Sequence, residues 1–380
     1  MMQRNVVIAG YARSPFTFAH KGEMVKLRPD EMAAQVVRGL LERSGVDPKD
    51  VEDLIVGCAF PEGEQGLNVA RLIGFLAELP IAVAGTTVNR FCGSSMQAIH
   101  MAAGSIQMDA GEAFLCAGIE SMSRVPMAGF NPLLHPGLAE RFPAAYISMG
   151  ETAENVARRH QITRARQEEL AVESHRKAAA AQGAGKLKDE IVAMQLNGAT
   201  VDADGCIRAD TSLEALAGLK PAFATDGSVT AATSSPLTDG ASAVLVTSED
   251  YAKAHGLKPL ARIRSIAVAG CDPDVMGMGP VAATNKALKR AGLTVKDLDI
   301  VELNEAFAAQ ALACADELGL DLEKANLDGG ALALGHPLGA TGARITGKAA
   351  ALLQREGKQF ALATQCIGGG QGIATILEAA

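Results

Sequence analysis

Several common features are missing from this 380-residue sequence, and each absence narrows what the protein can do. None of its seven cysteines forms a C-x-x-C pair, which argues against a structural zinc site and for a reducing compartment. No stretch reaches the ~18 consecutive apolar residues of a membrane span, and the first residues lack the layout of a signal peptide. We therefore expect a cytoplasmic protein with no metal site and no transmembrane segment.

Positive charge is also in short supply. The formal net charge is −8, which argues against nucleic-acid binding as the main function. Hydrophobic residues make up 48% of the chain and charged residues 21%, so the protein can bury a large core and is not disordered. The length predicts two or three domains.

Cys92 is the first candidate for a reactive group. The residues that follow it, 93–98, begin with small side chains and continue into a helix-forming segment. At a helix N-terminus, unpaired N–H groups and the helix dipole stabilise a thiolate, which is a nucleophile. Taken alone, this cysteine is explained equally well as a packing residue.

Three motifs nearer the C-terminus supply complementary chemistry. His336 lies in a glycine-rich turn, and the proline after it disfavours helical geometry, so we expect a displayed imidazole. Cys366 ends a predicted strand and precedes a glycine-rich loop whose N–H groups can form an oxyanion hole. Asn304 follows an apolar strand at residues 300–303. With Cys92, these residues provide a nucleophile, a base, a second thiol for proton transfer and a carboxamide that can hold water.

These four motifs, in this order, resemble the signature blocks of the thiolase family, and the similarity runs from the first strand to the last residues. Within the family, residues 92–98, 270–273 and 371–375 are most similar to the bacterial members that degrade 3-ketoacyl-CoA in fatty-acid β-oxidation. The resemblance implies an α/β thiolase fold, in which two similar halves pack as a layered αβαβα core with an inserted lid domain.

An internal repeat supports the two halves. Residues 41–51 resemble residues 288–298, an offset of 247, and residues 111–117 resemble residues 357–363, an offset of 246. The nearly constant offset predicts two copies of one α/β unit, with a composite site where their equivalent helix starts converge. The expected domains are residues 1–120 plus 238–258 for the N-terminal half, 121–237 for the lid and 259–380 for the C-terminal half.

The resemblance also implies the reaction, an acyl transfer that splits a 3-ketoacyl-CoA with free coenzyme A through an acyl-cysteine intermediate. It makes Cys92 the nucleophile, His336 the base, Cys366 the donor of a proton to the departing enolate and Asn304 the holder of a water. One oxyanion hole would come from His336 and that water, and the other from the backbone N–H groups of Cys92 and Gly368. Coenzyme A is then a cosubstrate, and no tightly bound cofactor is expected.

By resemblance, the lid binds CoA, and two positions depart from related sequences. Lys220 replaces an arginine that packs by the adenine, which removes the stacking plane of that contact. Ser148 replaces the histidine of short-chain members, which leaves room for a longer acyl chain. The residues expected to contact CoA or the acyl chain are Ser148, Met149, Lys220, Ser235 and Phe307.

Partners and alternative functions follow from the same resemblance. We expect a homodimer or homotetramer, with a hydratase/dehydrogenase subunit of a β-oxidation complex as a further partner. The first alternative is an acetoacetyl-CoA thiolase that runs the condensation. A ketoacyl synthase lacks support because its second histidine is missing, and a noncatalytic thiolase-fold subunit would not need all four reactive motifs.

Other motifs indicate no separate activity. Residues 342–349 nearly spell a phosphate-binding loop, but Ala349 replaces the magnesium-binding hydroxyl and the segment is predicted to be helical. The remaining cysteines are expected to pack in the core, with Cys206 more exposed than the others.

Overall fold

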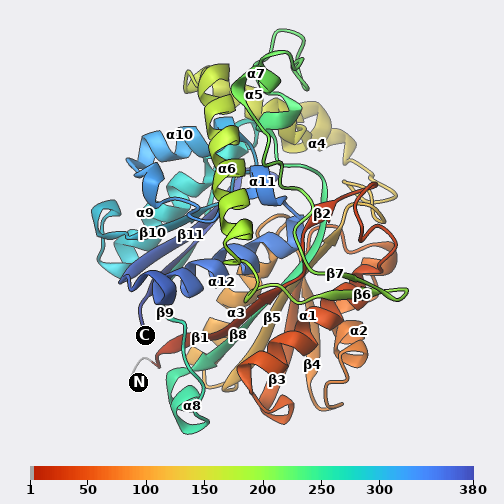
Figure 1. The fold of residues 1–380 in the computed structure, drawn as a ribbon, viewed down its shortest axis with the longest axis vertical. Coiled ribbons are helices and arrows are strands. Elements are labelled where there is room, and N and C mark those ends of the chain that lie inside the picture. Colours follow the sequence, from red (N-terminus) through yellow and green to blue (C-terminus); the bar gives the residue numbers. More distant parts are fainter. Residues whose placement is uncertain (1–3) are drawn as a thin grey trace.

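A computed structural model describes residues 4–380, which form two α/β halves joined through one sheet (Figure 1). The N-terminal half contributes β1 (Val6–Arg13), β2 (Thr17–Phe18), β3 (Val51–Cys58), β4 (Ala84–Val88), β5 (Ala113–Ser121) and β8 (Thr238–Ser248). The C-terminal half contributes β9 (Ala261–Gly270), β10 (Ile300–Leu303), β11 (Phe360–Ile367) and β12 (Gln371–Glu378). Helices of the halves are α1 (Pro29–Ser44), α2 (Val69–Leu76), α3 (Ser94–Gln107), α8 (Glu249–Ala254), α9 (Gly279–Ala291), α10 (Ala308–Leu318), α11 (Ala331–Leu334) and α12 (Leu338–Glu356).

The two halves repeat one strand topology, as the sequence repeat predicted. In the first half the order is β1-β8-β5-β3-β4, and in the second it is β9-β12-β11-β10. In both, the first two pairings are antiparallel and the third is parallel. The halves meet where β1 pairs with β9 over two residue pairs. The repeated helix ends also match, because Gly45 and Gly292 close α1 and α9 with φ of 73° and 71°.

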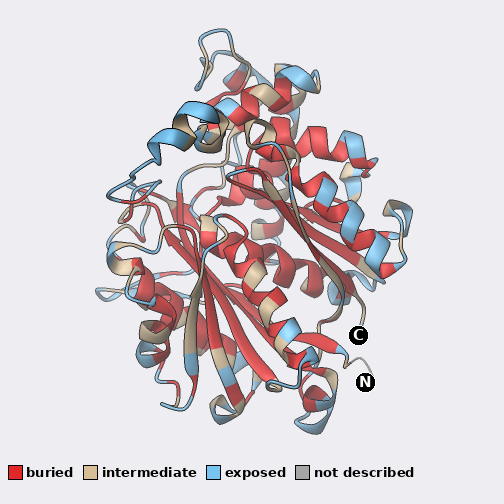
Figure 2. Cartoon of the chain, turned by 180° about the vertical axis from the view of Figure 1, so that it is seen from behind, coloured by how far each residue is buried: buried red, intermediate tan, exposed pale blue. Residues whose placement is uncertain are grey.

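Most strands of the sheet are buried on both faces, whereas β4 and β9 are only partly covered, and the buried strands define the layers. On β8, Val244 and Val246 face the central layer, whereas Ala243 and Leu245 face the outer layer formed by α1 and α2. On β11 the alternation is the same, with Leu362 facing the outer helices α9 and α10. A period of two with apolar residues at every position is what a doubly covered sheet requires. Figure 2 shows the strands and central helices as buried, with exposed residues mainly on the outer helices.

Helices α3 and α12 form the central layer and pack closely together. A Cβ at Gly342 of α12 would lie 2.3 Å from the backbone nitrogen of Met96 in α3, so only glycine allows this approach. The Ser95 hydroxyl of α3 accepts a hydrogen bond from the Ala343 N–H of α12 at 2.8 Å. The starts of the two helices are thereby fixed relative to one another.

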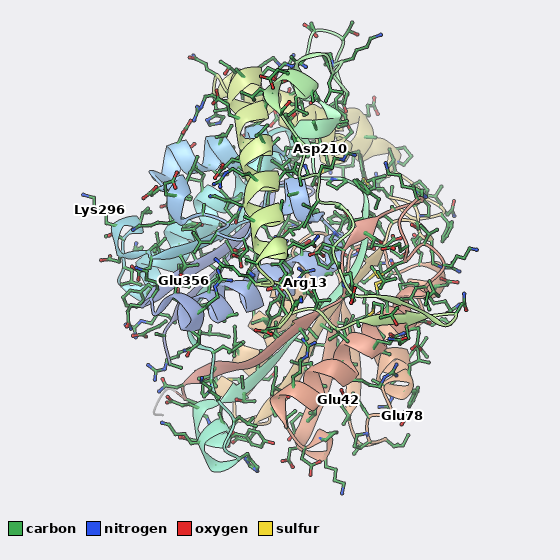
Figure 3. The ribbon with its side chains drawn as sticks, viewed as in Figure 1. Arg13, Glu42, Glu78, Asp210, Lys296 and Glu356 are labelled. Carbon is green, nitrogen blue, oxygen red and sulfur yellow. The ribbon has the colours of Figure 1, made fainter. Side chains whose placement is uncertain are left out.

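A long segment between β5 and β8 covers one end of the core. It contains α4 (Pro136–Arg141), α5 (Met149–Arg159), α6 (Arg164–Gly183), the hairpin β6 (Met194–Leu196) and β7 (Ala199–Val201), and α7 (Leu213–Ala217). Arg13 of β1, at the centre of Figure 3, donates to both carboxylate oxygens of Asp204 at 2.7 Å and to Glu190 at 2.8 Å. Lys348 of α12 donates to the same Glu190 at 2.8 Å. These paired buried charges anchor the segment to both halves.

The structure shows where Cys206 and residues 342–349 lie, two features for which the sequence led to specific expectations. Cys206 was expected to be more exposed, but it is only 1% exposed because the inserted segment packs around it. Residues 342–349 lie within α12, as predicted, so they cannot form a phosphate-binding loop. Among residues 4–380, no helix is both long and apolar enough to cross a membrane.

Candidate active site

Cys92 lies in a tight turn between β4 and α3. The N–H groups of Gly93 and Ser94 donate to the carbonyls of Arg90 and Phe91 at 2.9 and 3.0 Å. Phe91 adopts a φ of 41°, which is uncommon for a residue with a side chain and recurs at functional sites. The turn delivers Cys92 directly before the first turn of α3, where the sequence predicted it.

Burial and the neighbouring N–H groups act in opposite directions on the acidity of Cys92. The residue is only 9% exposed, and burial raises the pKa of its thiol to about 11. The N–H groups of Gly368 and of Cys92 itself interact with the sulfur and lower the pKa, but by less than burial raises it. Loss of hydration outweighs the effect of the helix start on the acidity of Cys92. The thiol keeps its proton until a base removes it.

The loop between β11 and β12 brings Cys366 and Gly368 to Cys92. Its next two glycines have φ of 78° and 82°, which allows β11 to reverse tightly into β12. The Gln365 amide donates to the carbonyl of Cys92 and ties the loop to the nucleophile turn. Cys366 is 1% exposed, and burial, followed by the neighbouring Cys92 thiol, raises its pKa well above the usual value. Both thiols are therefore protonated at rest.

His336 lies between α11 and α12 and is held by two threonines. Its backbone N–H donates to Thr238 Oγ1 at 3.1 Å, and its ring Nδ1 lies 2.6 Å from Thr341 Oγ1. Gly335 permits the first contact, because its φ is 102° and a Cβ there would lie 2.6 Å from Thr238 Oγ1. Burial, followed by the charge of Arg344, lowers the pKa of His336 to about 3. The imidazole is therefore neutral near neutral pH and can accept a proton.

Asn304 lies beside the His336 ring at the carboxyl end of β10. Its N–H donates to the carbonyl of Thr364 on β11 at 3.0 Å. Its Nδ2 is 3.4 Å from His336 Nε2 and 3.5 Å from Nδ1. Its Oδ1 is buried and meets no hydrogen-bond donor from the part of the chain that the structure describes. This oxygen can accept a hydrogen bond from water or from a group on a substrate.

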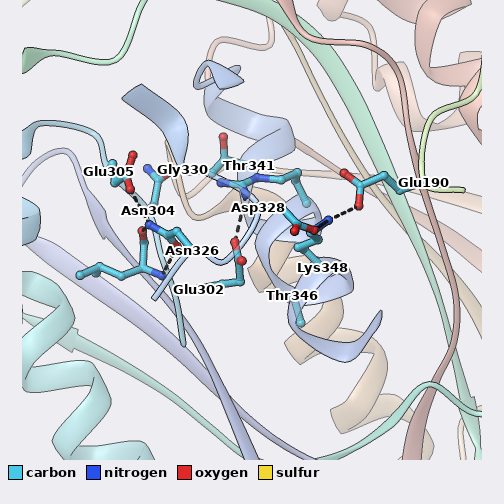
Figure 4. A network of polar contacts seen from close by, with 12 residues as sticks. Glu190, Glu302, Asn304, Glu305, Asn326, Asp328, Gly330, Thr341, Thr346 and Lys348 are labelled. Atoms are coloured by element: carbon cyan, nitrogen blue, oxygen red, sulfur yellow. Dashed lines mark hydrogen bonds and ion pairs between the residues drawn. The ribbon is translucent and has the colours of Figure 1, made fainter. Parts of the chain in front are cut away.

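Glu305 connects the segments that carry Asn304 and the imidazole (Figure 4). Its carboxylate accepts hydrogen bonds from the Ser174 hydroxyl at 2.7 Å, the Asn326 amide at 2.8 Å and the Leu332 N–H at 3.2 Å. Leu332 belongs to α11, which leads directly into the histidine turn. The carboxylate thus fixes α11 relative to the end of β10.

Three of the residues expected at CoA or the acyl chain approach the two thiols. Phe307 shares a buried apolar cluster with Cys366, and Met149 packs against that cluster. The Met149 sulfur lies 3.6 Å from the position of a Cβ at Gly368. The N–H of Ser235 donates to the carbonyl of the residue before Phe307 at 3.0 Å. Met149 and Phe307 therefore lie next to Cys366 and Gly368, and Ser235 is joined through its backbone to the residue before Phe307.

Lys220 and Ser148 lie at the surface. Ser148 is the N-cap of α5 and forms a capping box with Glu151, in which its hydroxyl donates to Oε2 at 2.7 Å. The Glu151 N–H donates back to Ser148 Oγ at 3.4 Å. The sequence argument considered only the size of Ser148 and missed this helix-capping role.

Sequence reasoning missed the polar residues that support the four motifs, which are Glu120, Thr238, Glu305, Thr341 and Gln365. Glu120 of β5 is 1% exposed and accepts from the N–H groups of Ala59 at 2.8 Å and Gly339 at 3.0 Å, so it links the halves. A single carboxylate in an otherwise apolar predicted strand was the available signal. Thr238 and Thr341 carried no comparable signal. Their hydrogen bonds to His336 form only because the chain brings distant segments together or folds into a particular turn.

Comparisons with known proteins agree with this architecture. A family model described as "Thiolase, N-terminal domain" matches residues 6–250, and one described as "Thiolase, C-terminal domain" matches residues 257–379. The 3-ketoacyl-CoA thiolase of Acinetobacter baumannii is 50% identical over 99% of this chain and 98% of that protein. The 3-ketoacyl-CoA thiolase of Bacillus subtilis is 45% identical over 99% of this chain and 100% of that protein.

Solved structures show the same relationship. Human mitochondrial 3-ketoacyl-CoA thiolase in complex with CoA has a TM-score of 0.92 and 38% identity, covering 100% of this chain and 99% of that one. The acetyl-CoA acetyltransferase of Bacillus anthracis has a TM-score of 0.91 and 40% identity, again covering 100% and 99%. With two matching domain models over nearly its full length and the repeated layered fold, this chain belongs to the thiolase family.

Proposed function

We propose that this protein catalyses CoA-dependent thiolytic cleavage of a 3-ketoacyl-CoA, giving acetyl-CoA and a shortened acyl-CoA in fatty-acid β-oxidation. The observation that carries the proposal is the arrangement of the site, in which the Gly368 N–H approaches the Cys92 sulfur and the buried His336 ring lies 3.4 Å from Asn304 Nδ2. The names of the bacterial relatives support this direction and substrate class.

In the first half-reaction, His336 takes the Cys92 proton and the sulfur bonds to the 3-keto carbon. The bond between the second and third carbons then breaks, and its electron pair moves to the second carbon as the enolate of acetyl-CoA. Cys366 gives that carbon its thiol proton, and the shortened acyl group stays on Cys92. The high pKa of a buried Cys366 suits a donor that releases its proton only to a strong base such as an enolate.

In the second half-reaction, incoming CoA attacks the acyl-cysteine. The proton count balances if the His336 imidazolium first reprotonates Cys366 and the neutral imidazole then takes the proton of the CoA thiol. The CoA sulfur bonds to the acyl carbon, the bond to Cys92 breaks, and the His336 proton returns to the cysteine. The enzyme ends in its starting state.

Two groups of donors would stabilise the negative oxygens of these steps. The N–H groups of Cys92 and Gly368 both interact with the Cys92 sulfur, so they lie close to an oxygen on the carbon bound there. His336 and a water held by Asn304 would serve the thioester oxygen of the enolate. Loss of one such donor typically lowers a rate by ~10²–10³.

CoA would bind along the inserted segment. Met149, Ser235 and Phe307 approach the thiols from that side, and Lys220 is exposed near the end of α7. The absence of an imidazole at Ser148 favours acyl chains longer than acetoacetyl.

A homodimer is the proposed assembly, with a hydratase/dehydrogenase subunit as the proposed further partner. Strand β4 closes one end of the sheet, and two apolar residues in the segment that leads from β3 to β4 are exposed, with Leu67 91% and Ile81 75% accessible. Pairing of two β4 edges would cover this surface. Light scattering of the purified protein tests this. All seven cysteines are free thiols, which supports the cytoplasm as the location.

The decisive experiment is a thiolysis assay with purified protein across 3-ketoacyl-CoA chain lengths, combined with mass spectrometry of the acyl-enzyme. We expect turnover of medium chains and an acyl adduct on Cys92. Activity confined to acetoacetyl-CoA would favour the acetyltransferase alternative. An adduct on Cys366 would overturn the assignment of the nucleophile.

A further inference from the structure

The imidazole of His336 has one ring nitrogen that cannot reach a substrate. Its Nδ1 lies 2.6 Å from the hydroxyl of Thr341, in the first turn of α12, and both residues are buried. Nε2 is therefore the nitrogen available for proton transfer. Which nitrogen carries the proton of the neutral ring decides whether His336 can act as a base.

The Thr341 hydroxyl has one proton to donate and lone pairs to accept with. It lies 3.0 Å from the carbonyl of Pro337, four residues earlier, and that carbonyl can only accept. If the hydroxyl donates to Pro337, it must accept from His336, so Nδ1 carries the proton. If instead it donates to Nδ1, then Nε2 carries the proton and cannot take another from Cys92.

Asn304 does not choose between these arrangements, because its Nδ2 lies 3.4 Å from Nε2 and 3.5 Å from Nδ1. The choice rests on the Pro337 carbonyl, which can only accept and lies 3.0 Å from the Thr341 hydroxyl. With the hydroxyl proton on that carbonyl, Nδ1 carries the ring proton and Nε2 keeps its lone pair.

We propose that Thr341 is a positioning residue that accepts the Nδ1–H of His336 and thereby keeps Nε2 as the proton-accepting nitrogen. This proposal rests on the proposed function for its catalytic meaning. When Cys92 is deprotonated, its proton goes to Nε2, while Nδ1–H remains bonded to Thr341. The threonine therefore supports both the neutral ring that receives the proton and the imidazolium that results.

The same helix offers a matched control. Thr346 is also fully buried, and its hydroxyl donates to the carbonyl four residues earlier, Gly342, at 2.7 Å. It lies farther along α12 than Thr341 (Figure 4) and has no hydrogen bond to His336. A Thr→Val change at either position removes a buried hydroxyl from the same helix, but only one of them touches the imidazole.

The test measures the tautomer directly. In full-length protein with ¹⁵N-labelled histidine, long-range proton–nitrogen NMR near neutral pH distinguishes the protonated ring nitrogen, and His336→Asn assigns the signal. We expect Nδ1–H in the wild type, in Thr341→Ser and in Thr346→Val. In Thr341→Val we expect Nε2–H or a mixture of tautomers. A wild-type ring protonated on Nε2, or an unchanged tautomer in Thr341→Val, would overturn the proposal.

Kinetics provide the second measurement. A buried N–H left without an acceptor should lower kcat by about ten- to a hundredfold in Thr341→Val, with KM little changed, while Thr341→Ser restores most of the rate. Thr346→Val should keep the wild-type rate, and equal losses in the two valine variants would reduce Thr341 to a packing residue. Failure of the proposed function would appear separately, as a wild-type protein without thiolysis but with the same NMR tautomer.

Discussion

The two halves of the molecule repeat one topology but carry different chemistry at equivalent positions. Cys92 lies two residues before α3 and His336 lies two residues before α12, and these helices pack together in the central layer. The N-terminal half contributes one thiol, whereas the C-terminal half contributes the imidazole, Asn304 and Cys366. The duplicated fold brings two helix starts together, and each copy then places a different group there.

The contrast extends into the helices themselves. The seventh residue of α3 is His100, whose Nε2 lies 2.8 Å from the Thr375 hydroxyl, and the seventh of α12 is Arg344, which pairs with Glu302 at 3.0 Å. Both lie in the buried central layer. One half therefore avoids the cost of a buried charge with a neutral ring, and the other offsets it with an ion pair.

The largest loss of activity is expected when the nucleophile is removed, because Cys92 is the reactive group that the N-terminal half contributes. Cys92→Ser replaces a thiol with a poorer nucleophile, so we expect turnover to fall by ~10⁴ or more. The measurement is thiolysis rate, with circular dichroism to verify folding. Cys271→Ser is the matched control and should stay close to wild type, because this half-buried cysteine contacts the Cys366 loop through its backbone N–H and its thiol has no proposed role.

Removal of the second thiol should slow the first half-reaction much more than the second. Cys366→Ala removes the proposed donor to the enolate, so carbon–carbon cleavage should slow by ~10²–10⁴. Transfer to CoA of an acyl group already loaded on Cys92 should slow far less. Rapid-mixing measurements of the two steps test this, and equal slowing would contradict distinct roles for the two cysteines.

The segment between β5 and β8, which has no counterpart in the repeated strand order, is tested at Ser148. Ser148→His should lower kcat/KM for medium chains relative to acetoacetyl-CoA by about tenfold to a hundredfold, because an imidazole fills space that only a longer acyl chain uses. Ser148→Ala is the control, since it removes the α5 cap without adding volume. If both variants change the ratio equally, the cap and not the pocket sets chain length.

The contrast between His100 and Arg344 predicts a pH effect on stability. Burial lowers the pKa of His100 to about 3, so the unfolded chain binds this proton more readily than the folded one. The contribution of His100 to the free energy of unfolding is therefore highest above about pH 6.5, the pKa of a histidine in the unfolded chain. It decreases as the pH falls toward 3, by up to ~1.4 kcal/mol per pH unit.

Urea unfolding at two pH values measures this effect. His100→Gln should reduce the loss of stability between about pH 7 and pH 5 by up to ~2 kcal/mol, since its side chain does not titrate. An identical pH dependence in His100→Gln and the wild type would contradict a neutral buried ring.

Local patterns were sufficient to locate several elements and the reactive motifs. The apolar run at residues 300–303 is strand β10, the turn around His336 separates two helices, and Cys366 lies at the end of β11, because these assignments depend on periodicity and on glycine and proline within a few residues. The repeated segments around Gly45 and Gly292 likewise indicated the duplicated fold.

The protonation states needed the folded protein. A helix start favours a thiolate at Cys92 when only neighbours in the chain are considered, but the pKa is set by water removed by segments hundreds of residues away. The hydroxyl partners of His336 depend in the same way on where β8 and the first turn of α12 lie in space. Burial, desolvation and hydrogen-bond geometry are properties of the assembled layers, so a residue's identity and neighbours in sequence specify its chemistry only in part.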